Sequence, residues 1–208
     1  MKQLLLHLIK ENLAEIANRS YLNYGVRGLH MIHILDAPNQ GIKMFVTDSN
    51  NDLQSSNPIG YTDGIKIPFQ YIGKNSCIEC LQGYVGIWNI EEENNNIALL
   101  VNKFSRKNSE YKLESSHVGI RTKQMIHLQP NQFYNIQGNE IVNFSSRFGT
   151  KSVWLVYEGR EIENLPDSYY TNIDNYNNKQ EFNKNDNLYI KTSSRDVVNM
   201  LDMIGLLK

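Results

Sequence analysis

Two pairs of side chains that could bind a metal ion are spaced three residues apart: Cys77 with Cys80, and His30 with His33. Thiolates and imidazoles are the ligands of structural zinc sites, and Cys-x-x-Cys also occurs in thiol redox proteins. Both pairs lie in stretches with a strand pattern, where positions three apart point to opposite faces. The pattern favours ordinary half-buried side chains, and we expect neither a metal nor another cofactor.

The histidines offer acid–base chemistry instead. None of the five shows a metalloenzyme spacing such as His-Glu-x-x-His. His33 and His127 lie among apolar residues, and with Asp63 and Tyr134 they are the candidates for a general acid and base facing one cavity. A histidine in such surroundings is more often a core residue. No nucleophile elbow, phosphate-binding loop or dinucleotide fingerprint occurs, so hydrolysis through a serine and nucleoside triphosphate chemistry have no support.

Aromatic side chains with polar tips are the remaining chemical signal. They lie in the predicted strands and suit a site for a sugar, a nucleotide base or a peptide. Most of these rings are expected to be core. The predicted ligand-binding residues are Tyr61, Asp63, Gln70, His127, Tyr134, Arg147 and Trp154.

Helices are predicted at both ends of the chain. Apolar residues at spacings of three and four favour an amphipathic helix over Lys2 to Asn18. A second helix is predicted from Ser194 to about Leu206, where Ser193 and Asp196 resemble a capping box. Each helix is expected to pack on a sheet.

Between the helices the periodicity is that of short strands separated by turn residues, which is typical of a sandwich or barrel. Residues 91–96 are expected to form an exposed hairpin tip, and 166–187, dense in Asn, Asp and Tyr, a long wrapping loop. The predicted strands cover 29–35, 42–47, 65–72, 77–90, 97–104, 111–113, 124–128, 132–136, 140–144, 152–157 and 188–191.

Size and composition indicate one domain. The 208 residues are enough for a single core. The predicted domain consists of an N-terminal helix (1–20), a β-barrel (21–160) and a wrapping loop with a helix (161–208). The net charge of −1 makes a nucleic-acid partner unexpected. No signal peptide or membrane span is predicted, so we expect a cytoplasmic protein with reduced thiols. The Asn-rich bias fits an AT-rich genome, such as that of a low-GC bacterium or its phage.

Two stretches resemble the paired motifs of the cupin superfamily. Residues 130–134 are similar to the second motif, with Asn131 at the place of its Gly and Tyr134 at the place of its His. Tyr61 and Asp63 stand at the places of the His-x-His in the first motif, and Gly83 matches its strand glycine. The resemblance implies a mainly β, double-stranded β-helix (jelly-roll) barrel with flanking helices. Because tyrosines replace the imidazoles, it implies a barrel without the family's metal.

Three functions follow from this reading. The first is a metal-free, cupin-like binding protein for a small polar molecule of sugar or nucleotide type. The second is a sugar isomerase or epimerase that uses His, Tyr and Asp side chains. The third is an interaction protein, such as a phage inhibitor of a host protein or a virion component. Homodimerisation is compatible with all three.

Overall fold

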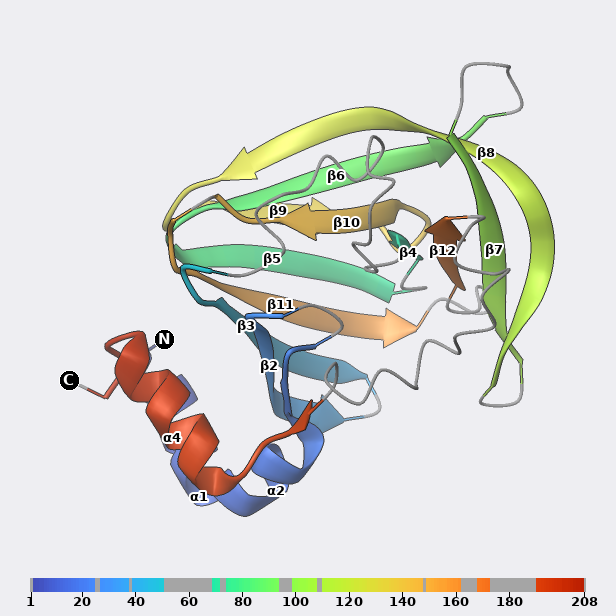
Figure 1. Cartoon of the computed structure of the whole chain (residues 1–208). Helices are drawn as coiled ribbons and strands as arrows, with labels where there is room; N and C mark the ends of the chain where they lie inside the picture. The colour runs from blue at the N-terminus through green and yellow to red at the C-terminus, as the bar shows by residue number, and fades with distance from the viewer. Residues whose placement is uncertain are drawn as a thin grey trace.

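The computed structural model describes residues 2–24, 27–37, 39–50, 69–71, 74–93, 99–107, 110–147, 149–161, 168–172 and 190–207. The chain is mainly β, as predicted, with strands between helices at both ends (Figure 1). None of the described helices has the length and hydropathy needed to span a bilayer. Of the predicted hairpin tip at 91–96, residues 94–96 lie outside the described residues, and Glu91 and Glu92 belong to the preceding strand. Most of the predicted loop at 166–187 also lies outside them, but Ser168–Asn172 form a strand, so the loop prediction was wrong there. The division into a single domain stays a prediction.

Sheet A has seven strands, all antiparallel to their neighbours. Its centre is built by long strands rich in β-branched residues, which pack well on a pleated surface. In spatial order the strands are β13 (Ile190–Lys191), β1 (Tyr21–Leu22), β2 (Leu29–Ala37), β3 (Gln40–Thr47), β11 (Ser152–Glu161), β5 (Lys74–Gln82) and β9 (Phe133–Ile136).

Sheet B is closed on itself. One of its strands is longer than predicted. The predicted strands 111–113 and 124–128 are parts of a single strand of 19 residues, β8, which bends around the end of the molecule (Figure 1). In order its strands are β10 (Ile141–Ser145), β4 (Phe69–Tyr71), β12 (Ser168–Asn172), β7 (Leu99–Lys107), β8 (Glu110–Leu128) and β6 (Val85–Glu92).

The predicted strand 77–90 is in fact two strands, β5 and β6, separated by a turn at Gly83. Gly83 has φ +75°, and a Cβ there would lie 2.2 Å from the carbonyl oxygen of Lys151. Only glycine fits such a position. Gly83 therefore makes the corner between the two sheets, and the resemblance that placed it inside a strand was wrong on this point.

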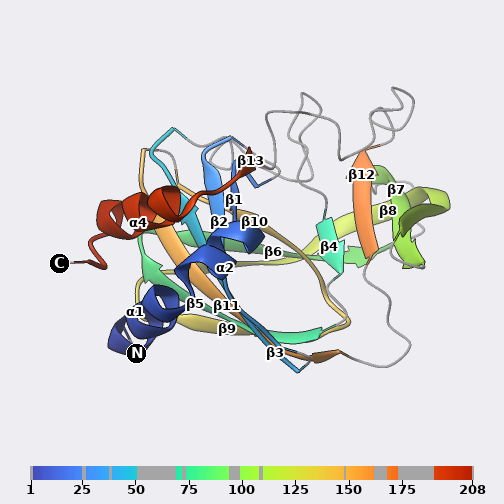
Figure 2. The ribbon, with the colours of Figure 1, turned by 90° about the horizontal axis from the view of Figure 1, so that it is seen from below.

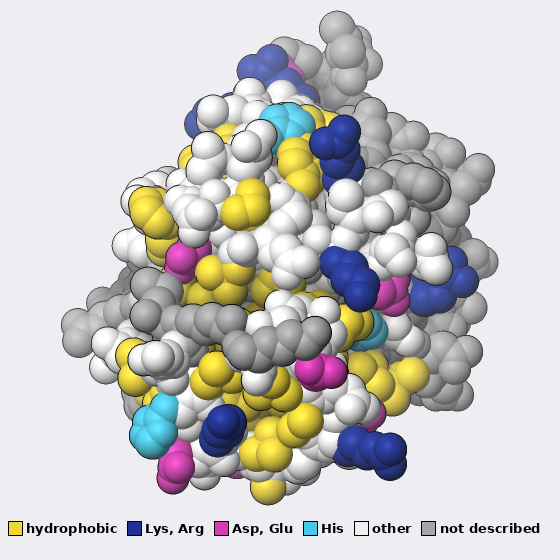
Figure 3. Space-filling model, turned by 90° about the vertical axis from the view of Figure 1, so that its left-hand side faces the viewer, with side chains coloured by type: hydrophobic (Ala, Val, Ile, Leu, Met, Phe, Trp, Pro, Cys, Tyr) yellow, Lys and Arg dark blue, Asp and Glu magenta, His cyan; other side chains and the backbone are white. Residues whose placement is uncertain are grey.

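The helices cover one face of sheet A (Figure 2). The predicted N-terminal helix is interrupted at Asn12, so that α1 (Lys2–Glu11) and α2 (Leu13–Arg19) are separate. The C-terminal helix α4 (Ser194–Met203) begins with the predicted capping box between Ser193 and Asp196. Apolar side chains gather on the end of the molecule where the helices lie (Figure 3). Four exposed large apolar residues belong to the helices or follow them directly: Leu4, Val198, Met203 and Leu207.

Alternation along the strands gives sheet A two apolar faces. The outer face packs under the helices, with Ile32, Met44 and Leu155 in one buried cluster with Ile16 and Val197. The inner face packs against sheet B in a second cluster. A third, smaller cluster lies within the closed sheet. Sheet A thus separates the helical layer from sheet B, and its inner face is where a barrel site is expected.

Candidate functional site

Strand pairing arranges the inner face of sheet A in rows, because residues directly opposite on antiparallel strands share a face. Three such rows run across β2, β3, β11 and β5, and two of them continue onto β9. The first, an apolar row, is Met31, Phe45, Trp154 and Cys80. The second is His33, Lys43, Val156, Ile78 and Tyr134. The third is Asp36, Gly41, Glu158, Ser76 and Ile136. Charge therefore gathers at one end of the inner face.

We call His33, Asp36, Lys43, Lys74 and Glu158 the inner charged cluster. Lys43 Nζ lies 2.5 Å from Glu158 Oε1, and Lys74 Nζ lies 3.7 Å from Glu158 Oε2. The Glu158 side chain is only 9% exposed, against 24% and 25% for the two lysines. A carboxylate this buried is stable in its charged form only when paired. The two lysines provide that pairing and leave this group of three with one excess positive charge.

Gly41 makes room for the carboxylate. A Cβ at Gly41 would lie 2.8 Å from Glu158 Oε2 and 3.3 Å from Glu158 Cβ. The absence of a side chain on β3 therefore lets Glu158 lie across the strand beside Lys43.

His33 adds an imidazole to the same cluster. Its Nε2 is buried and has no hydrogen-bond partner among the described residues, and Asp36 Oδ1 lies 3.9 Å away. Burial lowers the pKa of His33, and Lys43 lowers it further, while Asp36 opposes the shift. The imidazole is therefore neutral near pH 7, and its Nε2 can interact with a bound molecule.

Tyr24 approaches Glu158 from the β1–β2 turn. Its ring packs against Phe45, with the ring centroids 5.9 Å apart. Burial, reinforced by the negative charge of Glu158, raises the pKa of Tyr24 to about 12. The phenol therefore stays protonated and can donate a hydrogen bond.

Trp154 lies in the neighbouring apolar row. Its ring stacks on Phe45 at 5.4 Å between centroids with an interplanar angle of 14°, and the residue is 1% exposed. Its Nε1–H is buried without a hydrogen-bond partner in the described part of the chain. A buried donor left unpaired costs about 1–3 kcal/mol. An acceptor brought between the sheets by a ligand or a water molecule would offset that cost.

The other predicted site residues lie elsewhere. Tyr134 is on the inner face, but four strand spacings, about 19 Å, separate it from His33. Its hydroxyl donates to Glu140 Oε1 at 3.4 Å, and burial raises its pKa. Arg147 is exposed in the β10–β11 turn. Gln70 pairs through its backbone with Val142 and Tyr169 in sheet B. Tyr61 and Asp63 lie outside the described residues.

The expected acid–base pair of His33 and His127 does not form. His127 pairs with Gly86 in sheet B, is exposed, and contacts the ring of Tyr84 at 5.2 Å. Its neighbours Ile126 and Leu128 face the core between the sheets, so alternation turns the imidazole away. That hypothesis was wrong because a histidine between two apolar residues points opposite to both.

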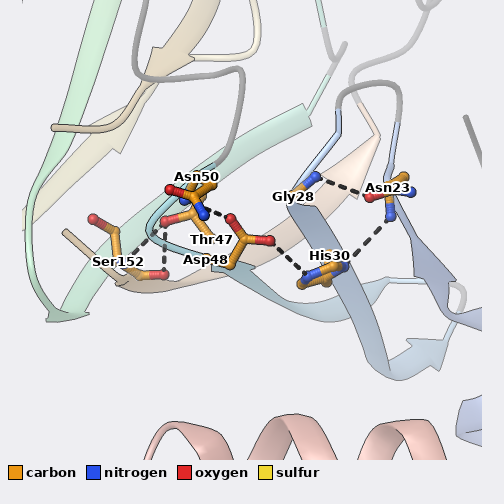
Figure 4. Close-up of polar contacts among 7 residues, drawn as sticks. All are labelled: Asn23, Gly28, His30, Thr47, Asp48, Asn50 and Ser152. Atoms are coloured by element: carbon orange, nitrogen blue, oxygen red, sulfur yellow. Dashed lines mark hydrogen bonds and ion pairs between the residues drawn. The ribbon is translucent and has the colours of Figure 1, made fainter. Parts of the chain in front are cut away.

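Strand alternation also separates the residues of the zinc hypothesis, because positions three apart on a strand point to opposite faces. Cys80 packs into the core between the sheets, whereas Cys77 lies opposite Tyr157 on the outer face. His30 lies opposite Val46 on the outer face, and Asn23 and Asp48 hold it there (Figure 4). The Asn23 backbone N–H donates to His30 Nδ1 at 3.4 Å, and Asp48 Oδ2 is 4.0 Å from His30 Nε2. The described residues contain no cluster of three or more potential metal ligands.

The turn that resembles the second cupin motif has the expected form. The Gln132 backbone N–H donates to the Gln129 carbonyl oxygen at 3.0 Å, and β9 follows at once. Asn131, at the place of the motif's glycine, has φ +67°. Asn is one of the few residues that adopt this conformation at low cost, so Asn131 fits this turn.

Sequence reasoning missed Lys43, Glu158 and Tyr24. A charged residue between apolar ones in a buried strand is unusual, and Lys43 in Ile-Lys-Met shows that pattern. Glu158 directly follows the apolar run that ends at Val156 and Tyr157. That signal could have identified Lys43, and only the strand register shows that its side chain meets Glu158.

Comparisons with known proteins found similar structures but no similar sequence. No family model matches the chain, and no curated protein sequence does. Among solved structures, an HTH_3 family transcriptional regulator from Vibrio cholerae is 7% identical with a TM-score of 0.40; the match covers 71% of this chain and 60% of that protein. A cupin superfamily protein from Desulfitobacterium hafniense is 12% identical over 64% of this chain and 78% of its own, with a TM-score of 0.34.

The EutQ protein of Clostridium difficile is 7% identical over 68% of this chain and 77% of its own length, with a TM-score of 0.36. Structural neighbours therefore include cupin superfamily proteins. These identities are too low to transfer a function.

Proposed function

We propose that the protein binds a small polar molecule of sugar or nucleotide type against the inner charged cluster. The supporting observation is a set of polar groups with unmet hydrogen-bonding capacity on one face of sheet A. Among the described residues, His33 Nε2 and Trp154 Nε1 are buried and have no hydrogen-bond partner. Lys43 lies directly opposite His33 in the register, and it pairs with Glu158 from the same strand as Trp154.

The chemistry of the cluster fits a ligand with several oxygen atoms. Lys43 and Lys74 donate hydrogen bonds, Glu158 accepts them, and the protonated Tyr24 phenol donates. Hydroxyl groups can use both kinds of partner, and a phosphate group can accept hydrogen bonds from the lysines and the phenol. Ligand sites commonly combine apolar walls with a few such polar groups, and Phe45 and Trp154 are the walls here.

A thermal-shift screen tests the proposal. The probes are glucose, galactose, ribose 5-phosphate, AMP and UMP, each added to the wild-type protein and to the Lys43→Met variant. We expect at least one probe to raise the melting temperature of the wild type, because a ligand that binds only the folded state stabilises it. Lys43→Met should lose that shift, whereas Arg147→Ala should keep it. No shift with any probe, or an equal shift in Lys43→Met, would contradict the proposal.

A further inference from the structure

A second polar region lies on the opposite, outer face of sheet A, beyond the part that the helices cover. A cavity of about 660 Å³ is found there. Its lining includes the outer-face row Leu35, Ile42, Tyr157, Cys77 and Asn135. It also includes the next outer positions along the same strands, Gln40, Gly159, Asn75 and Gln137. Tyr157 and Ile42 pack against the cluster under the helices, which confirms that this is the outer face.

The groove has an apolar floor and a rim of carboxamides. Ile42, Cys77, Tyr157 and Gly159 are half-buried at its floor. The rim carboxamides are all exposed; they are Asn39, Gln40, Asn75, Asn135 and Gln137. Each carboxamide both donates and accepts hydrogen bonds and carries no charge. Glu158 also contributes to the lining, but its carboxylate pairs with Lys43 on the inner face.

The floor and the rim are held in place. The Tyr157 hydroxyl donates to Glu79 Oε2 at 2.7 Å, and burial together with this bond raises the pKa of Tyr157, so the phenol stays protonated. Asn75 Oδ1 accepts a hydrogen bond from the Gly138 backbone N–H at 2.9 Å. At Gly159, a Cβ would lie 3.0 Å from the Asn75 carbonyl oxygen. Glycine there keeps the floor open between Tyr157 and the rim.

We propose that this groove binds a neutral oligosaccharide. Sugar hydroxyl groups both donate and accept, as carboxamides do, and the apolar patches of sugar rings fit an aromatic and aliphatic floor. The described side chains of the rim carry no charge, and the Glu158 carboxylate in the lining is already paired with Lys43. The volume falls within the range of about 300–1,000 Å³ that is usual for ligand pockets. The groove lies on the opposite face of sheet A from the inner charged cluster, although Gly41 and Glu158 contribute to its lining as well, and the proposal does not depend on the function proposed for that cluster.

Isothermal titration calorimetry of the full chain tests the proposal, with maltotriose, cellotriose, chitotriose and mannotriose as neutral probes and trigalacturonic acid as the acidic one. We expect at least one neutral probe to bind the wild type with a Kd of about 1 mM or lower. The double variant Asn135→Ala/Gln137→Ala should weaken that binding about tenfold. Both side chains are exposed, so folding should be unaffected. Gln82→Ala, an exposed carboxamide on β5 outside the groove, is the matched control and should bind as the wild type does.

His33→Gln separates the two sites, because His33 belongs to the inner charged cluster and does not line the groove; this variant should leave binding in the groove unchanged. Loss of oligosaccharide binding in His33→Gln, with full binding in the double variant, would overturn the groove and support the inner site instead. Absence of binding by every neutral probe would also overturn the proposal, as would equal or tighter binding of trigalacturonic acid.

Discussion

Two halves of the inner face of sheet A lie side by side on the same strands and have opposite character. In one, Phe45 and Trp154 stack in a buried apolar row. Two residues further along β11 and β3, Val156 pairs with Lys43, and beyond them Glu158 reaches the Lys43 ammonium. Each half contains a register shift, at Val153/Trp154 in the apolar half and at His33/Leu35 in the charged half. The difference shows that strand alternation fixes which face a side chain occupies, but not whether that part of the face is core or site.

The apolar half should contribute most to stability. Trp154→Ala removes a ring that is 1% exposed and stacked on Phe45, and such truncations cost about 3–5 kcal/mol of unfolding free energy. Urea denaturation measures this loss. Phe133→Ala, an aromatic residue that is 68% exposed, is the matched control and should cost less than about 0.5 kcal/mol. Equal effects of the two substitutions would show that Trp154 is not a core residue.

In the charged half, Lys43 and Glu158 should be strongly coupled in their contributions to stability. Glu158→Gln leaves Lys43 and Lys74 together without their carboxylate, at a cost of about 1–3 kcal/mol after allowance for their partial exposure. A double-mutant cycle with Lys43→Met should give a coupling energy above about 1 kcal/mol.

The pair of Arg121 and Glu91 is a suitable control for that cycle. Its Nη2–Oε1 distance is also 2.5 Å, but Arg121 is 57% exposed and Glu91 34%. Exposed pairs contribute about 0–1 kcal/mol, so the coupling of Arg121→Met with Glu91→Gln should be smaller. The reverse order would mean that burial does not distinguish the inner pair.

Gly41→Ala should have a moderate effect that depends on Glu158. The new Cβ would lie 2.8 Å from Glu158 Oε2, so the carboxylate must move away from Lys43, at a cost of about 1 kcal/mol. Chemical denaturation of Gly41→Ala in the wild-type and Glu158→Ala backgrounds measures this dependence. In the second background the cost should largely vanish. A cost independent of Glu158 would indicate backbone strain rather than displacement of the carboxylate.

The smallest expected effect is on the pH dependence of stability. Burial lowers the pKa values of His33 and His30 in the folded protein. The unfolded chain therefore binds protons from about pH 6.5 downward while the folded chain does not, so stability is lost as pH falls below that value. His33→Gln should reduce the dependence of the denaturation midpoint on pH between about pH 6.5 and 5, and adding His30→Gln should reduce it further. An unchanged pH profile in the double variant would contradict the burial of neutral imidazoles.

Features that depend on local periodicity could be predicted from the sequence. The helices, the capping box at Ser193 and most strand centres followed from periodicity, which is a local property. The break at Asn12 and the corner at Gly83 were missed. At Gly83 the decisive contact is with Lys151, far away in the sequence.

The candidate site was predicted less well than the fold. Trp154 was correctly placed on a strand, but it belongs to the apolar half of the face. Lys43 and Glu158 were missed because they are 115 residues apart, and only the register of β3 with β11 joins them. Pairing of this kind depends on long-range strand order, which a periodicity argument cannot supply.

The most direct test of binding at the inner face uses the two tryptophans of the chain as mutual controls. Trp88 Nε1–H already donates to Ser145 Oγ at 3.0 Å, whereas Trp154 Nε1–H has no partner in the described part of the protein. The measurement is a ¹H–¹⁵N spectrum of the indole groups, recorded with and without the probe that gives the largest thermal shift. Binding should move the Trp154 resonance strongly and leave that of Trp88 in place. Movement of the Trp88 resonance alone, or no movement of either while the probe binds, would contradict a ligand site on the inner face of sheet A.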